Sequence, residues 1–172
     1  GIPADIKSRL KTNDYANTKV QLLEFDQWNI TFMESGLKAR NKTLFDWTHA
    51  VDEKIKYFSG HAEYTSEFKY EGKTDGRAWL SLGVVNNLAH VWVNGKDCGI
   101  AWTAPYEVEI TGALQKGRNE VRIVVVNTWA NALRGADNGK APYEGIWTNA
   151  KYRMKGDALL PAGLIGPLGV RN

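Results

Sequence analysis

A tight turn between two apolar runs constrains the fold of this chain more than any other feature of its sequence. Asn94-Gly95 separates the runs 88–93 and 98–102, and both residues tolerate the positive φ angles that a type I′ hairpin turn requires. A second turn follows at residues 116–119, just before another apolar run. The pattern predicts antiparallel strands joined by short turns.

Two segments alternate between apolar and polar residues with the period of a strand. In the first, one face carries Ala62, Tyr64, Ser66, Phe68 and Tyr70. Residues 121–126 repeat the pattern, with Val121, Ile123 and Val125 on one face. One packed face and one hydrated face are typical of antiparallel sheets.

The chain as a whole reads as many short strands without a strong helical period, which predicts an all-β fold, an antiparallel β-sandwich or jelly roll. The remaining expected strands cover residues 20–25, 28–33, 78–82, 106–110, 145–153 and 164–170. Pro167 interrupts the last one and therefore predicts an edge position. Residues 35–54 and 128–144 are expected to be long connections. The predicted organisation is a leading segment over residues 1–18 and one sandwich domain over 19–172.

Composition restricts the classes of function. The 172 residues carry a net charge of +3 that is spread singly along the chain, so nucleic-acid binding is not indicated. The chain has no apolar run of membrane length and no signal peptide, and its first residue is Gly rather than Met, so we expect a piece of a longer protein. Seven Trp and seven Tyr suit either a sandwich core or platforms for sugar rings.

Catalytic machinery is weakly supported. Ser59 lacks the first glycine of a nucleophile elbow, and a structural serine is the better interpretation. Glu107 and Glu109 could act on a glycosidic bond only as a pair that faces the sugar, whereas two acids on one strand face are better explained as a hydrated surface. We therefore predict that this chain alone is not an enzyme.

Cofactor sites are not indicated either. Cys98 is the only cysteine and cannot form an internal disulfide; we expect it to be a small buried residue. No pair of histidines has metal-ligand spacing; the three are His49, His61 and His90. The sequence predicts no cofactor, although a structural calcium ion held by backbone carbonyls stays open.

Aromatic residues beside polar groups form the candidate sugar site. Sugars have apolar C–H faces and polar edges, so an aromatic ring near amide, guanidinium or carboxylate groups suits them. The strands that end near residues 102 and 126 could bring their loops to one end of the sandwich. The predicted sugar-binding residues are Trp102, Tyr106, Trp129, Asn131, Arg134 and Trp147. The alternative is that Trp102 and Trp129 plug the end of the core.

A series of short motifs, in this order, resembles a known family. The motifs are Tyr57-Phe58-Ser59-Gly60, Leu82-Gly83-Val84-Val85, Val93-Asn94-Gly95-Lys96, Gly99, Trp102, Pro105-Tyr106, Lys116-Gly117-Arg118-Asn119, Asn127-Thr128-Trp129, Asn131 and the stretch Pro161 to Pro167. Over residues 45–170 the chain resembles the carboxy-terminal galactose-binding-like domain of bacterial family 106 glycoside hydrolases of the α-L-rhamnosidase type, and the sugar-binding domain of family 2 enzymes. The family usually has Asn-Arg-Leu after the tryptophan, whereas this chain has Asn131-Ala132-Leu133 and an arginine only at Arg134.

The resemblance implies a non-catalytic carbohydrate-binding or accessory domain of a glycoside hydrolase that acts on plant-type or complex glycans. Its partners would be carbohydrate and the catalytic domain of the parent protein, with neither nucleic acid nor a membrane as a partner. It also implies a periplasmic or extracellular location. Two alternatives remain: a structural module that packs against a catalytic domain without binding sugar, and a small autonomous enzyme.

Overall fold

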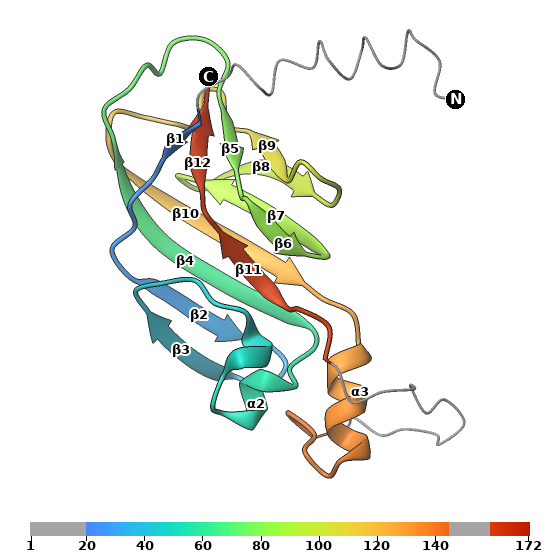
Figure 1. Ribbon diagram of the computed structural model, residues 1–172. Coiled ribbons are helices and arrows are strands. Elements are labelled where there is room, and N and C mark those ends of the chain that lie inside the picture. The colour runs from blue at the N-terminus through green and yellow to red at the C-terminus, as the bar shows by residue number, and fades with distance from the viewer. Residues whose placement is uncertain (1–19, 145–158) are drawn as a thin grey trace, which may run out of the picture.

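The computed structural model of the protein describes residues 20–144 and 159–172. Its larger sheet has six antiparallel strands in the order β3-β2-β4-β10-β7-β8 (Figure 1). Their bounds are β2 Trp28–Phe32, β3 Leu37–Asn41, β4 His61–Tyr70, β7 Leu88–Val93, β8 Lys96–Ala101 and β10 Gly117–Val126. The long pair β4 and β10 forms the centre of this sheet, with ten residues in register from Gly117 opposite Tyr70 to Val126 opposite His61.

A smaller sheet covers the inner face of the first. Its order is β1-β12-β5-β9, and its strands are β1 Gln21–Leu22, β5 Trp79–Ser81, β9 Glu107–Glu109 and β12 Gly169–Arg171. A two-stranded ladder joins β6 Val84–Asn86 to β11 Gly163–Gly166. The predicted antiparallel β-sandwich is confirmed.

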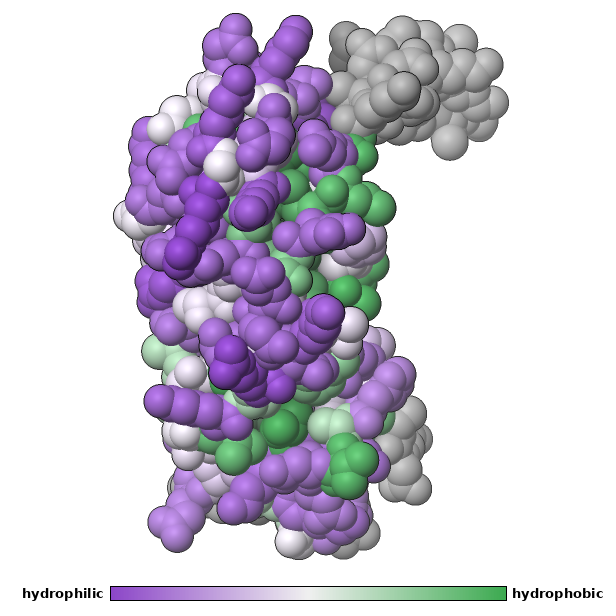
Figure 2. Space-filling model, turned by 90° about the vertical axis from the view of Figure 1, so that its left-hand side faces the viewer, coloured by the Kyte–Doolittle hydropathy of each residue, from purple (hydrophilic) through white to green (hydrophobic). Residues whose placement is uncertain are grey.

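The core lies between the sheets, and the predicted alternation places residues there. In β4 every second residue from Ala62 to Tyr70 is buried, and in β10 Val121, Ile123 and Val125 are buried. The smaller sheet contributes the buried residues Leu80, Val108 and Val170 to the core. The outward positions of β4 carry polar side chains, and from the left-hand side of Figure 1 the surface is mainly hydrophilic (Figure 2).

Buried aromatic rings fill the end of the core near α2. Trp47 and Tyr64 are fully buried, and the Trp47 Nε1–H donates to the Tyr64 hydroxyl at 2.7 Å. The same hydroxyl accepts the Leu164 backbone N–H at 3.3 Å. Burial, the largest effect, raises the pKa of Tyr64 to about 12.

The predicted hairpin turn is confirmed, and its asparagine also forms hydrogen bonds with the start of β10. Asn94 and Gly95 have φ angles of 51° and 77°, so β7 passes directly into β8. The Asn94 side chain accepts the Glu120 N–H at 2.9 Å and donates to the Asn119 side chain at 2.9 Å. Asn119 is itself fully buried and closes the turn before β10 through Gln115 and Gly117. These hydrogen bonds therefore tie the hairpin turn at Asn94-Gly95 to the turn that precedes β10.

Two segments expected to be long connections contain regular structure. Residues 35–54 include the strand β3, the 3₁₀ turn η2 Trp47–His49 and the start of α2 Glu53–Lys56. Residues 128–144 include the helix α3 Ala130–Asp137. The glycine within α3 argued against a helix, but a Cβ at Gly135 would lie 2.7 Å from the Tyr57 Cβ. Gly135 is thus needed for close packing of α3 on the sandwich.

The predicted edge strand at Pro167 is confirmed for only one half of its length. Pro167 lies between β11 and β12 rather than within a ladder; β11 is an edge of its two-stranded ladder, whereas β12 pairs on both sides, with β1 and with β5. The expected burial of Cys98 is also only partly met, since this side chain is half-buried. The expected strand 145–153 and the leading segment 1–18 lie outside the described residues.

Candidate functional site

The strand order places two of the predicted loops at one end of the sandwich. Strands β8 and β10 both run antiparallel to β7, so they are parallel to each other and end at the same edge. Ala101 and Val125 both pair with Ala89, so Trp102 and the segment that leads to Trp129 leave the sheet at the same level.

Both tryptophans are open to solvent. Trp102 is 71% exposed and Trp129 is 54% exposed, so neither plugs the core. The Trp129 ring lies 6.3 Å from the ring of Tyr143, whose hydroxyl donates to the Ser59 carbonyl at 2.8 Å. Partial burial, followed by the negative charge of Glu34, raises the pKa of Tyr143 to about 12.

Two other members of the predicted set have structural contacts. Asn131 is only 2% exposed, and its side chain forms two hydrogen bonds with the Leu160 backbone, at 2.7 Å and 2.9 Å. Its amide therefore holds the returning chain and is not open to a ligand. Tyr106 is half-buried against the core, and its carbonyl accepts the Leu82 N–H.

Arg134 and Trp147 complete the predicted set. Arg134 is half-buried on α3, one helical turn after Asn131 and hence on the same side of the helix. Trp147 lies outside the described residues. The structure thus leaves Trp102 and Trp129 as exposed rings at one end, with Arg134 on the adjoining helix. Among the described residues no ring contact joins the two tryptophans.

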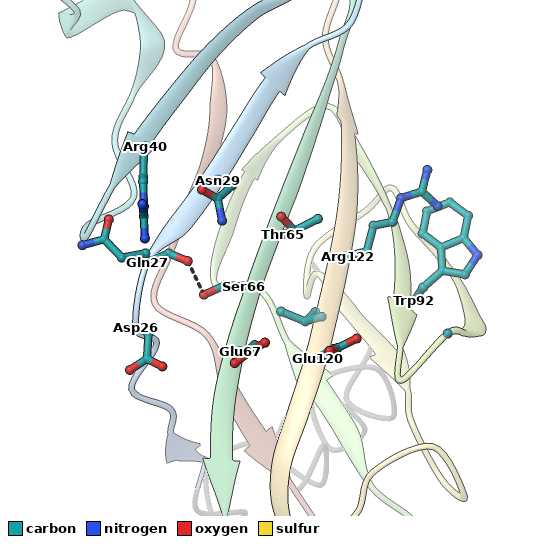
Figure 3. Close-up of a pocket in the computed structure, with 12 residues that line it drawn as sticks. Asp26, Gln27, Asn29, Arg40, Thr65, Ser66, Glu67, Trp92, Glu120 and Arg122 are labelled. Carbon is teal, nitrogen blue, oxygen red and sulfur yellow. Dashed lines mark hydrogen bonds between the residues drawn. The ribbon is translucent and has the colours of Figure 1, made fainter.

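A second candidate site was missed by sequence analysis. A groove of about 780 Å³ crosses the outer face of the six-stranded sheet (Figure 3). Its lining comes from β2, β3, β4, β7 and β10 and from the turns beside them. The labelled residues are Asp26, Gln27, Asn29, Arg40, Thr65, Ser66, Glu67, Trp92, Glu120 and Arg122. No local signal marks this set, because it is divided among five strands and no strand supplies more than three of its members.

Ion pairs and ring contacts hold several of the side chains that line the groove. The Arg122 Nε lies 2.9 Å from a Glu63 carboxylate oxygen, and its guanidinium lies over the Trp92 ring at 4.3 Å. His90 stacks on the same ring at 3.8 Å. Glu67 is engaged by Arg118. Much of the Trp92 ring is therefore already covered by protein groups, unlike Trp102 and Trp129.

The residues considered for catalysis have structural roles. Ser59 is fully buried, and its Oγ accepts the Ala132 N–H at 3.0 Å. Glu107 pairs with Arg171 at 2.9 Å. Glu109 binds Arg77 through two hydrogen bonds, which lower the pKa of the Glu109 carboxyl.

Residues 20–144 and 159–172 contain neither a cluster of metal ligands nor a membrane-spanning helix. This part of the chain brings together no group of three or more His, Cys, Asp or Glu side chains that could hold a metal ion. It also contains no helix of the length and apolarity needed to cross a membrane.

Comparison with known proteins identifies the family. A sequence model of the family described as "Glycosyl hydrolase 2 galactose-binding domain-like" matches residues 40–156. The chain belongs to that family. The match spans the hairpin, the central strands and α3, so it covers both the fold and the end of the sandwich that carries the exposed tryptophans.

Individual relatives agree with this membership. A protein of Formosa agariphila, provisionally named a beta-glucuronidase, is 32% identical over 83% of this chain and 15% of its own length. The structure of a rhamnosidase from Novosphingobium sp. PP1Y is 36% identical, with a TM-score of 0.77 over 90% of this chain and 15% of the rhamnosidase. The chain thus spans about 15% of the length of either relative.

A third similarity concerns the fold alone. The FMN-binding beta-glucuronidase from Facaelibacterium prausnitzii L2-6 matches with a TM-score of 0.56 at 20% identity, over 90% of this chain and 22% of that one. The sandwich is therefore found in glycoside hydrolases that have diverged widely in sequence.

Proposed function

We propose that this chain is a non-catalytic, carbohydrate-binding accessory domain of a larger glycoside hydrolase. Trp102, Trp129 and Arg134, at the end of the sandwich where β8 and β10 finish, are the proposed sugar contacts. The observation that carries the proposal is the exposure of two tryptophan rings, 71% and 54%, on loops at the same end.

The chemistry of this end suits a sugar. An exposed indole offers a flat apolar face for the C–H groups of a pyranose ring, while a guanidinium group can bind its hydroxyls. Such a site is shallow, so we expect dissociation constants of about millimolar to tens of micromolar, roughly 4–6 kcal/mol. Trp147 belongs to the proposed set on sequence grounds alone.

The parent protein is proposed to be an enzyme of the rhamnosidase type that acts on plant-type or complex glycans outside the cytoplasm. The 36% identity to a rhamnosidase over 90% of the chain supports this assignment. The catalytic residues would lie elsewhere in the parent, so the isolated chain should not hydrolyse aryl rhamnosides or galactosides. Turnover that disappears when one acid of this chain is changed would contradict this.

A second function is a structural module that packs on the catalytic domain and binds no sugar. The specific observation in its favour is that other apolar side chains accompany the tryptophans. Ile100 is 53% exposed two residues before Trp102, and Leu160, held by the Asn131 amide, is 48% exposed. Exposed apolar patches are typical of protein interfaces as well as of ligand sites.

Calorimetry on a panel of sugars, with thermal melts of each variant, separates the two functions. Trp102→Ala and Trp129→Ala should remove sugar binding and leave the melting temperature nearly unchanged, because these rings are exposed. Met33→Ala, which changes another large apolar side chain, 51% exposed and placed just after β2, is the matched control and should bind normally. An unmodified chain that binds no sugar would leave the structural module as the better function.

A further inference from the structure

The groove on the outer face of the six-stranded sheet contains a continuous row of side chains. Strand pairing aligns Arg40 with Asn29, Asn29 with Thr65, Thr65 with Arg122, and Arg122 with Trp92. All five residues line the groove, and Figure 3 shows them at one level across the strands. The row therefore runs perpendicular to the strands, from β3 to β7.

The part of this row on β3, β2 and β4 has free hydrogen-bonding capacity. Asn29 and Arg40 are exposed and Thr65 is half-buried. Among residues 20–144 and 159–172, the side chains of these three form no hydrogen bond or ion pair. Together they offer the donors of an amide and a guanidinium and the donor and acceptor of a hydroxyl.

A second row of groove side chains lies two residues further along β4 and β10. Its members carry negative charge, whereas the arginines of the first row carry positive charge. Glu67 is paired in register with Glu120, and Asp26 lies beside them in the groove (Figure 3). Two residues along a strand correspond to roughly 7 Å. A ligand that contacts the cationic row therefore also meets carboxylates within its own width.

This arrangement selects against strongly charged ligands. The groove is lined by two arginines and three acids, and Arg122 and Glu67 are already neutralised by Glu63 and Arg118. An anionic ligand drawn to Arg40 would be repelled by the acidic row. Neutral hydroxyl groups satisfy both rows, since each can accept from an arginine or amide and donate to a carboxylate.

We infer that the groove binds a neutral oligosaccharide that lies across the strands from β3 toward β7. The inference rests on the proposed carbohydrate-binding function, but it assigns a second contact surface and a ligand class. Four steps between strands span roughly 19 Å, which is longer than one sugar ring. Several sugar units are needed to fill the row, so affinity depends on chain length. Polar contacts dominate, because Arg122 and His90 already cover the Trp92 ring.

A pair of double variants tests this surface. Thr65→Val with Arg40→Gln removes a hydroxyl and a cation from the row. Thr31→Val with Lys38→Gln makes the same two changes at a cross-strand pair on the same sheet, outside the groove lining. All four side chains point outward, so both variants should fold, as thermal melts will show.

The probes are immobilised neutral and uronic-acid oligosaccharides of increasing length, with amide NMR shifts for any glycan that is retained. We expect neutral glycans to bind more tightly as they lengthen, with shifts on β2, β4 and β10. The groove variant should bind about tenfold more weakly, whereas the control variant should change less than twofold.

Three results would overturn the inference. Binding that is lost in Trp102→Ala or Trp129→Ala but kept in the groove variant would restrict sugar recognition to the end of the sandwich and leave the proposed function intact. Tighter binding of acidic than of neutral glycans of equal length would contradict the ligand class. A chain that retains no glycan at all would remove both the groove and the proposed function.

Discussion

Both outer faces of the sandwich have arginine side chains stacked over a tryptophan ring, but the polar side chains around the ring differ. On the smaller sheet, guanidinium groups of Arg77 and Arg171 lie over Trp79 at 4.8 Å and 4.2 Å, and each is held by a carboxylate of β9. On the larger sheet Arg122 lies over Trp92 in the same way. There, however, the neighbouring side chains of Arg40, Asn29 and Thr65 have no hydrogen bond or ion pair within residues 20–144 and 159–172.

The difference shows what marks a ligand surface on a sheet. A tryptophan alone does not, because both rings are covered by cations and act in cross-strand stabilisation. The distinguishing feature is the set of polar groups left without partners among the described residues, which the larger sheet has at Arg40, Asn29 and Thr65.

The largest effect is expected from the ion pair on the smaller sheet. Glu107 and Arg171 have side chains only 10% and 16% exposed, so Glu107→Ala leaves a charge largely removed from water. We expect a loss of about 2–4 kcal/mol in the free energy of unfolding. Glu63→Ala, which frees Arg122 on the larger sheet, should cost about 1 kcal/mol or less, since that pair is 30% and 43% exposed. Urea denaturation measures both, and equal losses would erase the contrast.

The pH dependence of stability tests the core beneath the groove. Burial raises the pKa of Tyr64 from 10 to about 12, so between these values the unfolded chain has released a proton that the folded chain retains. Its contribution is complete below pH 10 and is lost as the pH rises toward 12, by about 2–3 kcal/mol. Denaturation at pH 9, 10, 11 and 12 measures this, and Tyr64→Phe should flatten the slope.

Adjacent residues of β4 should respond differently at neutral pH. Tyr64→Phe leaves the Trp47 Nε1–H and the Leu164 N–H without their shared acceptor, at a cost of about 1–3 kcal/mol. Thr65→Val, one residue later but facing the groove, should cost less than about 0.5 kcal/mol. Thermal melts of the two variants provide the measurement. A large loss at Thr65 would mean that the groove face is built for stability.

The smallest effect concerns salt. The affinity of the groove for a neutral oligosaccharide should change less than twofold between about 0.05 and 0.5 M sodium chloride, because the ligand carries no net charge to screen. A several-fold weakening in calorimetry would indicate that Arg40 recognises an anion instead.

Several motifs that carried the family resemblance turn out to contact each other. The Asn94 side chain binds that of Asn119, and Asn131 binds the backbone of Leu160, the residue just before the stretch that begins at Pro161. Asn127 joins the start of β4 by accepting the Gly60 N–H at 2.8 Å and donating to the Phe58 carbonyl at 3.2 Å. These asparagines tie distant segments together, so the resemblance follows the fold more closely than it follows a binding site.

The sequence by itself determined five of the six strands of the larger sheet, all except β3, and the hairpin at Asn94-Gly95, because side-chain alternation and positive φ are local properties. It also indicated exposed aromatic loops at Trp102 and Trp129. It did not distinguish these rings from Asn131, whose burial depends on where residue 160 returns. It could not predict α3, because the close approach of Gly135 to Tyr57 is a tertiary contact.

Only the tertiary structure decided where the groove lies. Arg40, Asn29, Thr65, Arg122 and Trp92 come from five strands, and nothing near any of them in the sequence marks it as part of a site. They form a row because the pairing registers of β3, β2, β4, β10 and β7 bring them to one level. Register between strands is set by packing of the whole core and by the turns. A shift of one residue in any strand would move its side chain to the opposite face of the sheet and interrupt the row.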